Sequence, residues 1–195
     1  MKKSFSLIIV LTCTAIISGT VLAFLNAITK PRIEAHAARV LQNAVTDVLP
    51  GIDSYSRETI EDVEFFLGKD KEGNVINVAF QAIGNGFQSK LKILVGMDTE
   101  MKSILSINIL EQMETPGLGT KIETDPGNKE NRSWFPHQFK GLNLDNQNVS
   151  LKNEEPDKDK GQIMVITGAT ISSKAVVEIV NDVIEKNRKI FLKRG

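Results

Sequence analysis

A short segment near the C-terminus concentrates hydroxyl groups directly before a stretch with helical periodicity. In order, its residues are Thr167, Gly168, Ala169, Thr170, Ile171, Ser172 and Ser173. The first backbone N–H groups of a helix lack intrahelical partners, and the helix dipole favours negative charge at that end. The segment therefore predicts a socket for a phosphorylated ligand at a helix start. The alternative is a structural N-cap, in which Thr170 or Ser172 satisfies one of these N–H groups.

Nucleotide hydrolysis and serine hydrolysis are not supported by the sequence. It contains neither G-x-G-x-x-G nor G-x-x-x-x-G-K-[ST], and no serine lies within G-x-S-x-G. His36 and His137 offer no obvious base for a serine and lack the spacing partners of zinc ligands. A single cysteine, Cys13, allows no disulfide within the chain and no thiolate set for an iron–sulfur cluster. We therefore expect no catalytic residue and no metal site.

A second segment, residues 114–119, has the composition of a loop that approaches a flat ligand. It reads Glu-Thr-Pro-Gly-Leu-Gly. Pro116 fixes one φ angle, and the two glycines reach backbone conformations closed to other residues, so the main chain can come close to a planar ring. Without further context, the same string also fits an ordinary turn.

Both segments resemble motifs of the FMN-binding domain family. Residues 167–172, TGATIS, resemble its flavinylation motif, and residues 114–119 resemble the loop that this family places against the flavin. The family includes subunits of Rnf-type ion-translocating oxidoreductases and of the Na⁺-pumping NADH:quinone oxidoreductase, and the short chain favours the G subunit of the Rnf type. The resemblance implies that Thr170 carries FMN through a phosphoester bond installed by a flavin transferase. Met164 stands where the family usually has an acidic residue.

The resemblance also implies a set of cofactor-binding residues. Besides Thr170, the hydroxyl-rich segment would contribute Thr167, Gly168, Ala169, Ser172 and Ser173. The loop would contribute Glu114, Thr115, Gly117, Leu118 and Gly119, with Lys121 just beyond it. Glu114, Thr115 and Lys121 are expected to make polar contacts to the ring or ribityl chain, and Leu118 an apolar contact.

The N-terminal region has the length and composition of a membrane anchor. No residue from Ser4 to Thr29 is charged, and a helix of this length crosses a hydrocarbon core of about 30 Å. The alternative is a cleaved signal peptide, whose apolar region is usually shorter. Lys2 and Lys3 precede the span and favour a cytoplasmic N-terminus. We therefore expect a single-pass anchor, residues 1–30, in the cell inner membrane, and an extracytoplasmic (periplasmic) domain, residues 31–195.

The remaining pattern predicts an α+β fold, in which the transmembrane helix is followed by one FMN-binding domain with an antiparallel sheet packed by helices. Helical spacing indicates a linking helix within residues 31–50, ending at Pro50-Gly51, and a last helix from Ile171 to Leu192. Between them, apolar residues alternate in three segments that predict strands. These triplets are Ile76, Val78 and Phe80; Leu91, Ile93 and Val95; and Leu105, Ile107 and Ile109. Residues 122–161 are polar and mostly predicted as loop.

Charge and motif together lead to one functional hypothesis. Lys plus Arg and Asp plus Glu both number 24, so the balanced charge gives no basic face for nucleic acid. The hypothesis is a membrane-anchored electron-transfer subunit with covalent FMN. It would be the redox subunit of a larger ion-translocating oxidoreductase rather than an enzyme on its own. Its partners would be other membrane subunits, membrane lipid and the flavin transferase. The alternatives are a single-pass sensory or binding module that docks FMN or another phosphorylated ligand without a covalent bond, and a purely structural assembly subunit.

Overall fold

The computed structural model describes residues 2–145 and 147–193, with side chains from residue 5 onward. Contacts divide the chain into two units, residues 1–41 and 42–195, and each unit is described by itself. Helix α1 (Lys2–Val48) makes up the described part of the first unit and the first residues of the second. Among the described residues, this helix is long and apolar enough to cross a membrane, and its most apolar window is not buried.

Within its apolar stretch, α1 satisfies polar side chains internally. The Thr14 hydroxyl donates to the carbonyl of Leu11 at 2.9 Å, and that of Thr20 donates to the carbonyl of Ile16 at 2.8 Å. Such bonds allow threonine in an apolar medium, because no hydroxyl is left without an acceptor. The helix continues through Pro31 rather than ending before a separate linking helix. Residues 31–48 of the predicted linking helix are therefore the C-terminal part of α1.

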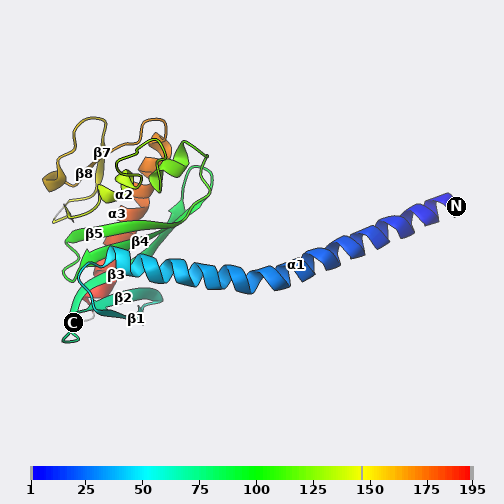
Figure 1. Ribbon diagram of the computed structural model, residues 1–195, viewed down its shortest axis with the longest axis horizontal. Helices are drawn as coiled ribbons and strands as arrows, with labels where there is room; N and C mark the ends of the chain where they lie inside the picture. Colours follow the sequence, from blue (N-terminus) through cyan, green and yellow to red (C-terminus); the bar gives the residue numbers. More distant parts are fainter. Residues whose placement is uncertain (1, 146, 194–195) are drawn as a thin grey trace. The chain divides into compact units, whose positions relative to one another are not determined.

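The second unit is built on an antiparallel sheet of six strands that lie in chain order (Figure 1). These are β1 (Ser54–Ile60), β2 (Val63–Lys69), β3 (Val75–Asn85), β4 (Lys90–Asp98), β5 (Ser103–Glu111) and β6 (Leu142–Asn143). Two short strands, β7 (Ser150–Lys152) and β8 (Gln162–Met164), pair in parallel outside this sheet. The other helices are η1 (Gly119–Ile122), α2 (Trp134–His137), η2 (Lys158–Lys160) and α3 (Thr170–Leu192).

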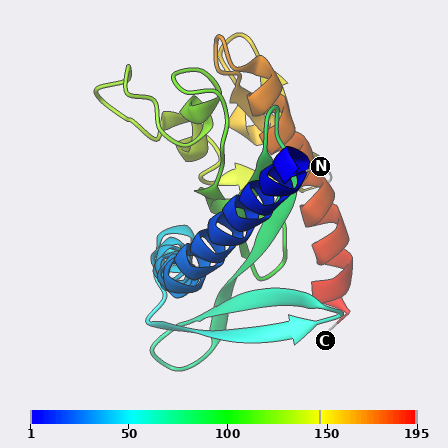
Figure 2. The ribbon, with the colours of Figure 1, turned by 90° about the vertical axis from the view of Figure 1, so that its right-hand side faces the viewer.

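Both faces of the sheet are covered, and alternate residues of each central strand point to opposite sides. In β3, Val78 and Phe80 belong to the main core under α3, whereas Ala79 is buried on the other face. That face receives the last turns of α1, where the carbonyl of Val48 lies against Gly96 of β4. Figure 2 shows the sheet between α3 and this end of α1. The sheet therefore packs against α3 on one face and against the end of α1 on the other.

The predicted fold class is confirmed, but the sheet is larger than the sequence pattern indicated. The three predicted segments lie in β3, β4 and β5, while β1 and β2 were missed. In β2, consecutive Phe65, Phe66 and Leu67 are all buried because both faces are covered, so no alternation is visible. In β5 the inward residue is Ile104 rather than Leu105, because the ladder register shifts opposite Gly96 and Met97.

The contact between β4 and α1 gives a first prediction. In Gly96→Ala, the new Cβ would meet the backbone of Val48, which cannot move aside as a flexible side chain would. We expect the free energy of unfolding to fall by about 1–3 kcal/mol or more. Thermal and chemical denaturation of the full chain in detergent measures this change. Gly127→Ala, at an exposed loop position, is the control, and an equal loss of stability in both variants would contradict the packing argument.

Candidate functional site

The chain turns sharply from β8 into α3 through the hydroxyl-rich segment. Gly168 has φ of 82°, a left-handed conformation that favours glycine, and the N–H of Ala169 donates to the carbonyl of Ile166 at 3.0 Å. Ala169 is the N-cap residue, and no side chain of the cap accepts from the N–H groups of the first turn. The start of α3 therefore keeps the positive end of its dipole without a capping side chain.

The four hydroxyl groups of this segment fall into two pairs. Ser173 donates to the carbonyl of Ala169 at 3.0 Å and accepts from the N–H of Ile166, and Ser172 donates to a buried carboxylate. Both serines are buried and serve the turn itself. Thr167 and Thr170 are exposed, and within residues 2–145 and 147–193 neither hydroxyl makes a hydrogen bond. Only the threonines are thus free to react with an external group.

A pocket of about 350 Å³ joins the two sequence motifs. Its lining comes from three separate segments of the chain. The lining residues are Phe87, Thr115, Leu118, Gly119, Gly168, Ala169, Thr170, Ile171 and Ser172. Thr170 is therefore the exposed hydroxyl of the α3 turn that also faces the cavity, whereas Thr167 lies outside it.

The pocket combines apolar walls with a polar end. Phe87, Leu118 and Ile171 are about half exposed, at 55%, 48% and 59%, so a ligand could lie on them while staying open to the surroundings. The polar lining residues are Thr115 of the loop and Thr170 and Ser172 at the start of α3. This arrangement suits a ligand with a flat apolar body and an anionic tail. The volume is near the lower limit of about 300–1,000 Å³ for ligand sites, so it would enclose part of such a ligand.

Glu114 lies behind the pocket wall rather than in it. Its side chain is buried, and its Oε2 accepts from the Ser172 hydroxyl at 2.6 Å. Its Oε1 accepts from the backbone N–H groups of Gln88 at 3.0 Å and Ser89 at 3.3 Å. The carboxylate therefore connects the loop of residues 114–119, the turn after β3 and the first turn of α3.

Several predicted residues lie outside the lining of the pocket. Lys121 Nζ is 3.8 Å from Asp125 Oδ1 and does not line the cavity. Gly117, with φ of 75°, donates its N–H to the Thr120 hydroxyl and shapes the turn instead. Thr167, Ser173 and Glu114 are likewise absent from the lining. Conversely, Phe87 and Ile171 line the pocket but were not among the predicted site residues. For Phe87, the signal available in the sequence was its position directly after Gly-Asn-Gly, a turn-forming segment.

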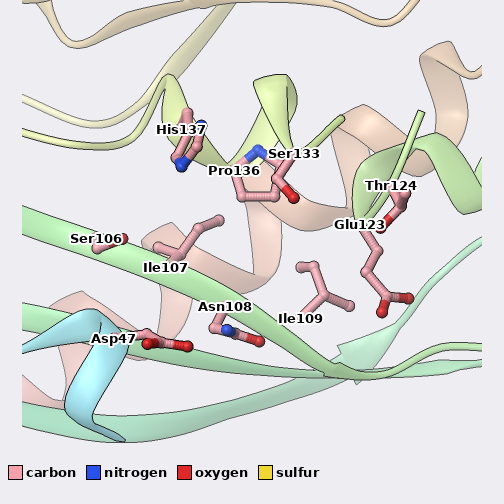
Figure 3. Close-up of a pocket in the computed structure, with 10 residues that line it drawn as sticks. All are labelled: Asp47, Ser106, Ile107, Asn108, Ile109, Glu123, Thr124, Ser133, Pro136 and His137. Atoms are coloured by element: carbon pink, nitrogen blue, oxygen red, sulfur yellow. The ribbon is translucent and has the colours of Figure 1, made fainter. Parts of the chain in front are cut away.

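A second, larger pocket of about 430 Å³ lies beside β5 (Figure 3). Its lining is mostly polar and contains neither motif. The lining residues are Asp47, Ser106, Ile107, Asn108, Ile109, Glu123, Thr124, Ser133, Pro136 and His137. Two of its polar groups already have partners, since His137 Nδ1 is 2.9 Å from Asn131 Oδ1 and Glu123 accepts from Gln112 at 3.0 Å. Size alone therefore does not identify the functional site, and the smaller pocket is the candidate because residues of both motifs line it.

The class of protein follows from this fold and pocket together with a family comparison. Residues 86–185, which include both motifs and all lining residues of the smaller pocket, match the FMN-binding domain. The chain belongs to the FMN-binding domain family.

Comparison with individual relatives adds a more specific similarity. The chain is similar to proteins named as the G subunit of an ion-translocating oxidoreductase complex. One from Methanosarcina acetivorans is 24% identical over 192 residues, covering 94% of each chain. One from Haemophilus influenzae strain Rd is 29% identical over 184 residues, covering 87% of this chain and 80% of the relative.

Solved structures support the same fold. The C subunit of the Na⁺-translocating NADH-quinone reductase from Parabacteroides distasonis superposes with a TM-score of 0.53 at 22% identity. The match covers 66% of this chain and 62%, less than two thirds, of that one. NqrC from Shewanella oneidensis gives a TM-score of 0.52 at 18% identity, covering 74% and 73%. At these identities the likeness extends to the fold alone.

The turn before α3 gives a second prediction. Gly168→Ala places a side chain at φ of 82° and against the Leu118 side chain, 3.4 Å from the new Cβ. We expect the free energy of unfolding to fall by about 1–3 kcal/mol, the usual cost of a residue held in this region. Denaturation of the full chain in detergent measures it. Thr167→Ala, at an exposed neighbour without hydrogen bonds in the described chain, should change stability by less than about 0.5 kcal/mol.

Proposed function

We propose that this chain is a membrane-anchored electron-transfer subunit of an Rnf-type ion-translocating oxidoreductase, with FMN bound covalently to Thr170. One observation carries the proposal. Thr170 is the exposed hydroxyl that faces the motif-lined pocket at the start of α3, while Ser172 and Ser173 are buried and engaged. The names of the relatives support the assignment to such a complex.

The residues of the pocket fit FMN. The N-terminus of α3, which has neither a capping side chain nor an acidic residue in its first turn, favours the phosphate. Phe87, Leu118 and Ile171 offer apolar contact to the ring system, and the glycines of the loop let the main chain approach it. When bound, the flavin supplies the electron transfer, and the protein binds and orients it.

The covalent bond is formed at one atom of this chain. Thr170 Oγ1 would bond to the FMN phosphorus of an activated flavin dinucleotide while the phosphoanhydride bond on that phosphorus breaks, so that a nucleoside monophosphate leaves and the ribityl ester stays intact. The hydroxyl proton would pass to a base of the transferase. A flavin transferase supplies the activated nucleotide and the catalytic machinery. A tether has a physical purpose here, because the walls of the pocket are half exposed and a dissociable flavin outside the cell would be lost to dilution.

The proposed location is the cell inner membrane, with residues 1–30 as the anchor. The run from Ser4 to Thr29 is uncharged, and the hydroxyls of Thr14 and Thr20 are satisfied within the helix. Lys2 and Lys3 at the start favour a cytoplasmic N-terminus. The domain of residues 31–195 would then lie outside the cytoplasm and contact other membrane subunits of the complex.

The linkage gives a third prediction. When the chain is co-expressed with a flavin transferase, we expect flavin fluorescence to stay with the denatured polypeptide and intact mass to show one FMN adduct. Thr170→Ala should abolish both signals, whereas Thr170→Ser should keep them because its hydroxyl occupies the same position. Thr167→Ala, which removes the other exposed hydroxyl, is the matched control and should retain the adduct.

The opposite results distinguish the alternatives. Flavin that is released by denaturant would indicate non-covalent docking, as in a binding or sensory module. A colourless wild-type chain would remove the basis of the carrier function. If Thr170→Ala left electron transfer by the complex unchanged, the chain would be a structural assembly subunit.

The orientation gives a fourth prediction. In a Cys13→Ser background, Asn153→Cys introduces a thiol on an exposed part of the domain, and Ser4→Cys introduces one at the start of the uncharged run while keeping Lys2 and Lys3. We expect a membrane-impermeant maleimide to label position 153 in intact spheroplasts and position 4 only after the cells are opened. The reverse labelling pattern would overturn the proposed orientation.

A further inference from the structure

The buried carboxylate of Glu114 joins the turn after β3 to the first turn of α3, and the proposed flavin site depends on the relative position of these segments. We propose that Glu114 is a positioning residue, which sets Thr170 and the pocket walls for flavin attachment without touching the flavin itself. This inference rests on the proposed function. It differs from the role implied by the sequence motif, in which Glu114 contacts the ring or ribityl chain.

The contacts of Glu114 support an indirect role. Only 3% of the residue is exposed, and it is absent from the lining of the pocket. Its two oxygens accept from one hydroxyl and two backbone N–H groups, which come from two different segments of the chain. Hydrogen bonds to a carboxylate are shorter and stronger than bonds between neutral groups. Both oxygens therefore already bind groups of the protein, and the one bonded residue that lines the pocket is Ser172 rather than Glu114.

Each of these bonds lies in a wall of the pocket or next to one, since Ser172 is itself a lining residue. Gln88 follows Phe87, and Ser172 lies two residues after Thr170 in the first turn of α3. The loop of Glu114 itself supplies Thr115, Leu118 and Gly119 to the lining. A shift of the carboxylate would therefore move all three walls relative to Thr170.

Two glycines make room for this arrangement. A Cβ atom on Gly86 would lie 2.5 Å from Glu114 Oε1, and one on Gly119 would lie 2.7 Å from the Cβ of Glu114. The second would also lie 2.9 Å from the Ser172 hydroxyl oxygen. The close approach of three segments around one carboxylate is thus possible only without side chains at these positions.

Replacement of Glu114 by glutamine keeps the size of the side chain but disrupts its hydrogen bonds. A glutamine oxygen can still accept from the N–H groups of Gln88 and Ser89, but its NH₂ group cannot accept from Ser172. The Ser172 hydroxyl would have to turn and accept from this NH₂ group, so that its own hydrogen loses the acceptor that Glu114 provides. A buried donor is then left without an acceptor, which is costly enough to shift the local equilibrium about tenfold. We expect the first turn of α3 and the turn after β3 to separate, so that Thr170 is presented less often in the correct position.

The experiment compares Glu114→Gln, Ser172→Ala and the double variant with wild type. The full chain is purified in detergent without flavin, confirmed as folded by circular dichroism, and then incubated with a flavin transferase and its flavin nucleotide substrate. The rate of covalent incorporation is followed by fluorescence of the denatured chain. Backbone hydrogen exchange of Gln88 and Ser89 is measured on the flavin-free protein. Glu111→Gln, an exposed glutamate on the same segment, is the matched control.

We expect Glu114→Gln to slow incorporation about tenfold, Ser172→Ala to slow it several-fold, and the double variant to be no slower than the slower single variant, because both act through one contact. Exchange of Gln88 and Ser89 should become faster in Glu114→Gln but not in Glu111→Gln. A structural role confined to fold stability would lower the melting temperature and leave the rate in folded protein unchanged.

Other results would overturn the proposal. A wild-type rate in Glu114→Gln would do so, as would slow incorporation without faster exchange, since Glu114 would then act on the transferase. If Glu114→Gln does not fold, Ser172→Ala tests the proposal instead. A wild-type rate of flavin incorporation in Ser172→Ala would contradict the proposal, and a several-fold slower rate would support it. Failure of the proposed function is distinct, because the wild-type chain would then incorporate no flavin.

Discussion

One hydrogen bond organises the candidate site: the Ser172 hydroxyl donates to the Glu114 carboxylate at 2.6 Å, across 58 positions of sequence. Among residues 2–145 and 147–193, it is the side-chain hydrogen bond that joins the start of α3 to the loop of residues 114–119. The same carboxylate accepts from the turn after β3, so three segments share one buried charge. A buried carboxylate must be fully hydrogen-bonded, and this requirement restricts the three segments to one mutual arrangement.

The sheet provides the rigid frame for that arrangement. Covering by α3 on one face and by the last turns of α1 on the other requires glycine where backbone approaches closely, as at Gly96 against Val48. The turn after β3 and the loop after β5 leave the sheet at the same end, beside the start of α3 (Figure 1). The pocket therefore forms from loops at one edge, whereas the strands carry the core.

The sequence indicated which segments form the candidate site, but not where the individual side chains of those segments point. The two motifs were expected to meet, and they line one pocket, because loop composition and a helix start are local properties. The directions of Glu114, Ser172 and Lys121 depend on packing between distant segments, which no local pattern contains. Likewise, β2 was missed because its consecutive phenylalanines are buried on opposite faces, and burial of both faces erases alternation.

The half-exposed walls of the pocket affect how a flavin is retained and how closely a redox partner can approach it. An affinity site must surround its ligand, and that enclosure lengthens the path to any redox partner. Under the proposed linkage, a bond at Thr170 keeps the cofactor regardless of how weakly the walls hold it. The flavin ring can then stay near the protein surface, within short tunnelling distance of an approaching electron carrier. A docking partner can also change the orientation of the ring without releasing the flavin.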